Sequence, residues 1–199
     1  MNMEDFDIYL KQVYAEFGAL RQLLERFPES EASKVVQMAL ITAKAIRGGN
    51  VVFTCGNGGS AADAQHIAGE LVGRFRRKVK GYKAFALTTN SSIVTAIAND
   101  YSYEEIFSRQ LESRAQSGDI LLALSTSGMS PNVVKAAEVA NELGLTSLAF
   151  VGKKGGRLAE VSNIALIVPD EDFARIQEVH MTLGHILCGL VEEFVLAPV

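Results

Sequence analysis

Five short apolar runs, separated by stretches of helical character, occupy the chain from residue 51 onward. They lie at 51–55, 84–88, 120–125, 147–151 and 164–168 and are rich in apolar and β-branched residues. Strands that are apolar throughout are buried on both faces, and strands that alternate with helices are typical of a parallel sheet covered on both sides. The sequence therefore predicts an α/β sandwich around a five-stranded parallel sheet.

Helices precede and follow this region. From about residue 4 to residue 27, apolar side chains recur at helical spacing. A second helix is expected after Pro28, with its N-cap near Ser30 or Ser33, ending at Gly48-Gly49. The last long helix should run from about 173 to 196. We expect one domain, 1–199, with a helical extension at 1–48 and an α/β core at 50–196. The apolar faces of the first and last helices could pack between subunits or within a monomer.

Composition excludes several classes of protein. The chain has 199 residues, 48% of them hydrophobic, which suits one domain with a real core and not a disordered chain. A net charge of -4 does not suit a general nucleic-acid binder. Cys55 and Cys188 lie in apolar stretches and are expected to be reduced and buried. The first ten residues are acidic, unlike a signal peptide, and charges or histidines interrupt every apolar run before it reaches membrane-spanning length. We expect a cytoplasmic protein that binds neither nucleic acid nor membrane.

Three of the predicted strands run into loops of small and polar residues, at 56–60, 125–130 and 152–156. Ligands of open α/β sheets bind beyond the carboxyl ends of the strands. In the first loop, CGNGGSAADAQH, three glycines allow the backbone to approach a ligand, and Ser60 is expected to cap the next helix. The same letters fit a dinucleotide-binding pattern, but no acidic residue stands between 71 and 99 to bind a ribose. A site for NADP that uses an arginine instead stays open.

The second loop, STSGMSP, points to a bound phosphate. It brings four hydroxyls into six residues: Ser125, Thr126, Ser127 and Ser130. Ser130 followed by Pro131 also predicts a helix start. Hydroxyls beside the free N–H groups of a helix N-terminus are typical of an anion site.

Histidines and a glutamate suggest a second centre. His66 and Glu70 are four residues apart, so they share one face of a helix and suit a zinc ion or a proton-transfer pair equally well. His180, His185 and Gln177 lie on the last helix. Gln177 and His185 are separated by a rise of about 12 Å, so both could bind one metal only if it lay midway between them. His180 points about 140° away from His185, and spacing does not decide which of the two is a ligand.

Together, CGNGGSAADAQH with Glu70, AIANDY, LSTSGMSPNV, the GKKGG loop and ARIQEVH…H resemble the phosphoheptose isomerases of the sugar isomerase (SIS) superfamily. The match runs from the second helix to the last. The resemblance implies a flavodoxin-like α/β sandwich and a homotetramer with active sites at subunit contacts. It also implies a zinc ion, one per subunit.

The resemblance assigns roles residue by residue. It implies substrate contacts at the turn Asn57, Gly58 and Gly59, at the pair Asn99 and Asp100, and at Glu70 and Gln177. It places the phosphate at Ser125, Thr126, Ser127 and Ser130. The metal positions it implies are His66, Glu70, Gln177 and His185, and Glu70 and His185 match the acid–base pair. The chain departs from some members at Gly69 and Ala174, where those members carry acidic residues.

The implied reaction interconverts sedoheptulose 7-phosphate and D-glycero-D-manno-heptose 7-phosphate by enediol proton transfer, an early step toward bacterial surface heptose. A non-catalytic alternative is a sugar-phosphate-binding SIS protein or a regulator associated with the replication initiator. That regulator lacks the acid–base residues at the positions of Glu70 and His185, which are both present here. An isomerase or deaminase acting on a different sugar phosphate also stays open.

Overall fold

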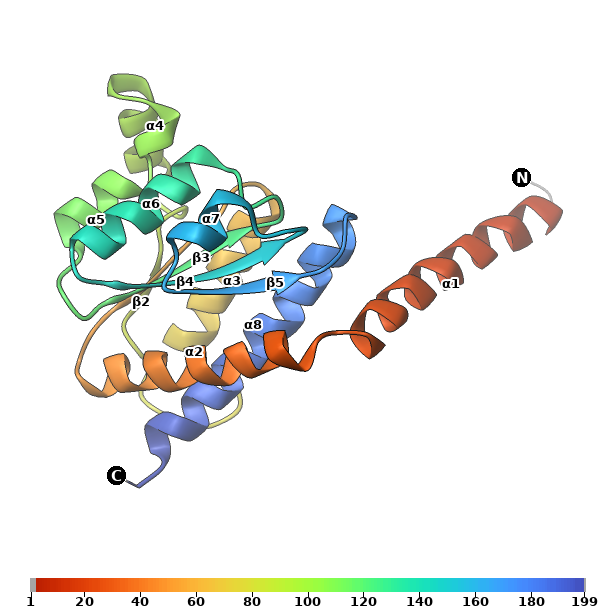
Figure 1. Cartoon of the computed structure of the whole chain (residues 1–199), viewed down its shortest axis with the longest axis horizontal. Coiled ribbons are helices and arrows are strands. Elements are labelled where there is room, and N and C mark those ends of the chain that lie inside the picture. Colours follow the sequence, from red (N-terminus) through yellow and green to blue (C-terminus); the bar gives the residue numbers. More distant parts are fainter. Residues whose placement is uncertain (1–2, 199) are drawn as a thin grey trace.

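A parallel five-stranded sheet forms the centre of the computed structural model, which describes residues 3–198 (Figure 1). Residues 1, 2 and 199 of the expected domain lie outside the described residues. The strands stand in the order β2-β1-β3-β4-β5, and every neighbouring pair is parallel. Their bounds are β1 Val52–Cys55, β2 Ala84–Ala86, β3 Ile120–Ser125, β4 Thr146–Gly152 and β5 Ile164–Val168. The predicted α/β class and the five strands are confirmed.

Helices cover both faces of the sheet, which makes three layers (Figure 1). One face carries α2 (Glu29–Arg47), α3 (Gly59–Val72) and α8 (Phe173–Leu196). The other carries α5 (Ser108–Arg114), α6 (Pro131–Glu142) and α7 (Gly156–Val161). Successive strand residues point to opposite faces, so Val52 packs with the first group of helices and Phe53 with the second. Both clusters of side chains are closed to water, which explains why the strands read as apolar throughout.

The strand order determines where a ligand can bind. It is the flavodoxin-like order: the chain passes from β1 to β2 on one side, then crosses back to β3 on the other side of β1. Cys55 pairs with Ala123, and Ser125 pairs with Val151. The loops that follow β1, β3 and β4 are therefore neighbours at the carboxyl edge of the sheet.

The start of two helices differs from the sequence prediction. α2 begins at Glu29, directly after Pro28, which is the N-cap with the extended backbone angles φ -64° and ψ 133° that are typical of this position. Ser30 and Ser33 lie inside the helix, where the Ser33 hydroxyl donates to the Ser30 carbonyl. Similarly, Gly58 is the N-cap of α3, with φ +56°, and Ser60 is a buried residue of the first turn. Glycine takes this position because an L side chain is strained at such an angle.

The first helix, α1 (Met3–Glu25), points away from the body of the molecule (Figure 1). Among its described side chains only Leu23 is buried, while Phe6 and Phe17 are 50% and 63% exposed. Near the middle of α1, Glu16 forms an ion pair with Arg175 of α8. The apolar stripe of α1 is therefore not covered within one chain.

Two expectations about apolar segments have different outcomes. By length and composition α8 could span a membrane, so the expectation that no segment reaches that length is wrong. Half of its most apolar window is buried inside the protein, and core helices pass the same test. Cys55 and Cys188 are free and buried, as predicted. Burial raises the pKa of each thiol to about 12, which leaves almost no reactive thiolate at neutral pH.

Candidate active site and metal centre

The candidate site lies along the seam between α3 and α8. Both helices begin at the carboxyl edge of the sheet, after β1 and β5, and pack side by side. They pack tightly at Gly184, where a Cβ would lie 2.8 Å from Cδ1 of the buried Ile67. A residue without a side chain at this position therefore allows its neighbour His185 to reach α3.

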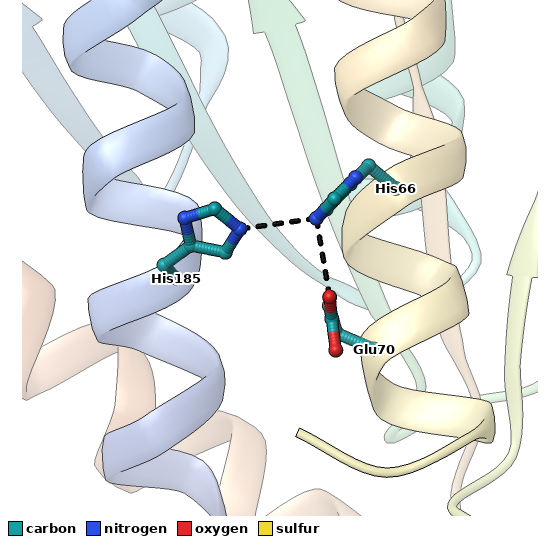
Figure 2. Close-up of side chains that lie close together, drawn as sticks. All are labelled: His66, Glu70 and His185. Atoms are coloured by element: carbon teal, nitrogen blue, oxygen red, sulfur yellow. Dashed lines mark hydrogen bonds and ion pairs between the residues drawn. The ribbon is translucent and has the colours of Figure 1, made fainter. Parts of the chain in front are cut away.

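Three side chains meet in this seam (Figure 2). His66 Nε2 lies 3.0 Å from His185 Nε2 and 3.1 Å from Glu70 Oε1, and one donor atom of each residue falls within 4.8 Å of the others. Tetrahedral zinc with bonds of about 2.0–2.1 Å holds its ligand atoms about 3.3 Å apart. Two imidazoles and a carboxylate at these separations fit a divalent ion, and the same groups suit proton transfer.

Gln177 lies nearer the start of α8. A Cβ at Gly59 would overlap its side-chain amide, which also lies near the buried Asp63. Burial raises the pKa of the Asp63 carboxyl, which Gln177 and His66 partly oppose. Gln177 therefore lies between the glycine turn at Gly59 and Asp63, which is one helical turn before His66 on α3.

The loop after β3 brings three serine hydroxyls together. The Ser125 hydroxyl oxygen lies 3.5 Å from that of Ser127 and 3.3 Å from that of Ser130, and the Gly128 N–H donates to Ser125. Ser130 is the N-cap of α6, but its hydroxyl makes no capping bond, so it remains available to a ligand. Thr126 belongs to the same loop and is partly exposed.

The GKKGG loop, residues 152–156, packs against the backbone of the hydroxyl loop, residues 125–130. A Cβ at Gly128 would overlap the carbonyl of Gly155, and the Leu158 N–H donates to the Gly128 carbonyl at 2.9 Å. Gly128 has φ +66°. The close backbone contact and this angle both require glycine, which explains the residue at the centre of the loop.

Asn57 of the first loop is held by two residues that the sequence reasoning missed. Asn57 and the buried Asn132 exchange two hydrogen bonds of 2.8 and 2.9 Å, and the Tyr103 hydroxyl donates to Asn57 Oδ1 at 3.0 Å. No local pattern connects Asn57 to a partner 75 residues away. Asp63 was also missed, although its position three residues before His66 places both on one face of α3.

The remaining candidates lie apart from the cluster. Asn99 and Asp100 end α4 (Ser91–Asp100), where they are exposed and joined by a 2.8 Å hydrogen bond. Tyr103, three residues farther on, contacts Asn57, so the end of α4 lies near the first loop. His180 is buried, and its ring centroid lies 5.9 Å from that of Phe150. Of the two histidines that spacing could not separate, the structure brings only His185 to His66 and Glu70.

The chain is similar in sequence and in structure to known proteins. Residues 17–152 match the SIS domain family. A phosphoheptose isomerase of Aquifex aeolicus is 47% identical over 94% of this chain and 97% of its own, and one of Thermodesulfovibrio yellowstonii is 50% identical over 97% and 93%. The structure of a phosphoheptose isomerase from Neisseria gonorrhoeae superposes with a TM-score of 0.84 at 35% identity, covering 94% of this chain and 99% of that one. The chain therefore belongs to the SIS domain family.

Proposed function

We propose that this protein is an aldose–ketose isomerase that interconverts sedoheptulose 7-phosphate and D-glycero-D-manno-heptose 7-phosphate, at an early step of bacterial heptose synthesis. Relatives named for this activity match the chain nearly from end to end. The observation that carries the proposal is the meeting of Glu70 with His185 from a distant helix. These are the residues that a non-catalytic relative would not need.

In this mechanism Glu70 and His185 divide the proton transfers. Converting the ketose to the aldose requires removal of a proton from C1 and delivery of a proton to C2, through an enediol. Glu70 carries this proton between the two carbons. In the first step His185, as a general acid, gives a proton to the carbonyl oxygen at C2. In the second step it takes the proton from the hydroxyl at C1, so His185 is regenerated.

The rest of the substrate is bound along the carboxyl edge. Ser125, Thr126, Ser127 and Ser130, with the N–H groups at the start of α6, bind the phosphate. The turn Asn57, Gly58 and Gly59, the pair Asn99 and Asp100, and Gln177 contact the sugar hydroxyls. An anchored phosphate sets which carbon faces the reacting groups, and this orientation itself lowers the barrier.

The metal that suits this site is zinc, one per subunit, with His66, Glu70, Gln177 and His185 as its ligands. The converging nitrogens and oxygen of three of these residues support a divalent ion. When bound, zinc supplies Lewis-acid polarisation of the substrate oxygens. A mixed nitrogen and oxygen ligand set should release zinc to chelators more readily than thiolate ligands do.

We also infer a homotetramer with active sites at subunit contacts, in the cytoplasm. The uncovered apolar stripe of α1 supports association, and free buried cysteines suit a reducing compartment. The chain 1–199 is one domain in this proposal, with 1–48 as its helical extension. In support, Val35 and Met38 of α2 belong to the same core cluster as α3, α8 and the sheet.

A single assay tests the function. Purified with zinc supplied, the protein should convert sedoheptulose 7-phosphate to the aldose, followed by NMR. Glu70→Gln and His185→Gln should each lower kcat by at least about 100-fold, the usual scale for losing acid–base help. His180→Gln is the matched control and should keep most of the activity, because His180 lies in the core.

Chelation should lower activity, and zinc should restore it without any change in far-UV circular dichroism.

Three outcomes would contradict parts of this proposal. A fully active Glu70→Gln variant would exclude Glu70 as the base. A fully active preparation from which elemental analysis finds no metal would make Glu70 and His185 a metal-free acid–base pair. No turnover of this substrate, combined with tight binding of it, would favour the sugar-phosphate-binding alternative.

A further inference from the structure

A short loop between α3 and β2 is fastened to α8 by a buried carboxylate. Glu192, 3% exposed, accepts four hydrogen bonds of 3.0–3.3 Å from three successive backbone N–H groups, those of Phe75, Arg76 and Arg77. A buried carboxylate is costly unless such donors surround it, and charge-assisted bonds of this kind are strong. The backbone of the loop is therefore held in one position against α8.

This attachment places the Phe75 ring on His185. The two rings are nearly parallel, with an interplanar angle of 13° and centroids 5.6 Å apart. A Cβ at Gly189 would lie 3.4 Å from Phe75 Cε1, so the ring also covers α8 one turn beyond His185. His185, Gly189 and Glu192 follow one another at four and three residues, which puts them on the same face of the helix.

Between its neighbours the imidazole of His185 has little room to turn. Phe75 stacks against it, and His66 meets it nearly edge-on, with centroids 5.0 Å apart and an angle of 70°. Rotation of the imidazole about its χ2 bond would move Nε2 away from His66 and Glu70. Packing by Phe75 opposes this rotation, while Phe75 itself has no group that can exchange a proton or bind a metal.

We propose that Phe75, anchored by Glu192, is a positioning residue for His185. The inference rests on the proposed function, because it assigns Phe75 to the same acid–base and metal centre. Removing the ring should leave the imidazole present but free to rotate. Residues that orient a ligand from behind typically contribute about 10–100-fold to metal affinity or activity.

The test compares Phe75→Ala and Phe75→Tyr with the unchanged protein. Phe75→Ala should lower kcat about tenfold with little change in KM, since the phosphate loop is unaffected, and should weaken zinc binding about tenfold in competition with a chelator. Phe75→Tyr keeps the ring and should restore both values. By NMR, the carbon-bound protons of His185 should lose their ring-current shift in Phe75→Ala and keep it in Phe75→Tyr.

Phe85→Ala is the matched control, since it removes a 54% exposed phenyl ring that stacks on Phe53 in the sheet, away from the seam. It should leave kcat, zinc affinity and the His185 signals unchanged. Glu192→Gln replaces one carboxylate oxygen with an NH2 group, which donates instead of accepting, and should change the same three readouts as Phe75→Ala.

Unchanged His185 signals and unchanged zinc affinity in Phe75→Ala would overturn the inference. If the protein without any substitution does not turn over the heptose phosphate, that result would instead contradict the proposed function. The NMR and zinc measurements do not depend on turnover, so they would still decide the role of Phe75.

Discussion

His180 and His185 stand five residues apart on α8 and have opposite surroundings. His185 is partly exposed beside polar partners, whereas neither ring nitrogen of the fully buried His180 has a hydrogen-bond partner among the described residues. Burial lowers the pKa of His180 to about 4, from 6.5 for an ordinary histidine. Its ring is therefore neutral at physiological pH and acts as a packing residue against Phe150.

This burial predicts a pH dependence of stability. Above pH 6.5 His180 is neutral in both the folded and the unfolded state, so it contributes no slope. Between pH 6.5 and pH 4 only the unfolded state binds the proton, so the free energy of unfolding should fall as pH falls. At about 1.4 kcal/mol per pH unit, the loss should reach about 2–3 kcal/mol near pH 4.5.

Urea unfolding at several pH values checks this expectation. A His180→Leu variant cannot bind the proton and should lose less stability on acidification than the unchanged protein, while every other titrating group is shared. Parallel stability curves for the two proteins between pH 7.5 and pH 4.5 would exclude His180 as the source.

At the scale of an element, the hydroxyl loop after β3 depends on two neighbours. The GKKGG loop contacts its backbone at Gly128, and Asn132, at the start of α6, holds Asn57 of the loop after β1. The loops after three adjacent strands thus form one connected edge. A substitution in one of these loops should therefore alter substrate binding and leave the fold intact.

Ser125→Ala combined with Ser127→Ala tests phosphate binding by this loop. Each lost hydrogen bond to a charged group is worth about 1.5–3 kcal/mol, so KM for the sugar phosphate should rise at least about tenfold. Ser113→Ala on α5, whose hydroxyl donates to the Gln110 carbonyl, is the matched control and should leave KM unchanged. Equal affinity for inorganic phosphate in the double variant and the unchanged protein would exclude the loop as the phosphate site.

At the scale of the whole molecule, α1 carries a stripe of large apolar side chains that the rest of the chain leaves exposed. Phe6, Tyr9, Val13 and Phe17 are each about half exposed or more and follow one another at helical spacing. A long apolar stripe of this kind usually marks a protein–protein contact.

Phe17→Asp is therefore expected to break the proposed tetramer. A charge in the middle of a buried apolar contact is strongly unfavourable, and light scattering after size exclusion should show a lower mass. Gln22→Asp introduces the same carboxylate on the opposite face of α1 and should leave the mass unchanged. An identical mass for Phe17→Asp and the unchanged protein would place the subunit contact elsewhere.

Local patterns in the sequence determined the layered architecture. Apolar runs of strand length, helical periodicity and the Ser130-Pro131 start report only on residues close in the chain, and the five strands and the long C-terminal helix were predicted from them. The pairing of His66 with Glu70 is also local, since four residues make one turn of helix. Predictions failed where two local signals competed, as at Ser30 and Ser60, because proline and glycine backbone angles decided the helix starts instead of a serine hydroxyl.

The meeting of distant residues in the seam was decided by the tertiary structure, although the family resemblance had already named His185. His66 and His185 are 119 residues apart, and Phe75 and Glu192 are 117 apart. Spacing on α8 left His180 and His185 equivalent. What separates them is the packing of α8 against both the sheet and α3: one histidine faces the core, and Gly184 lets the other approach His66. Such contacts depend on how two buried surfaces fit together, and no short stretch of sequence contains both surfaces.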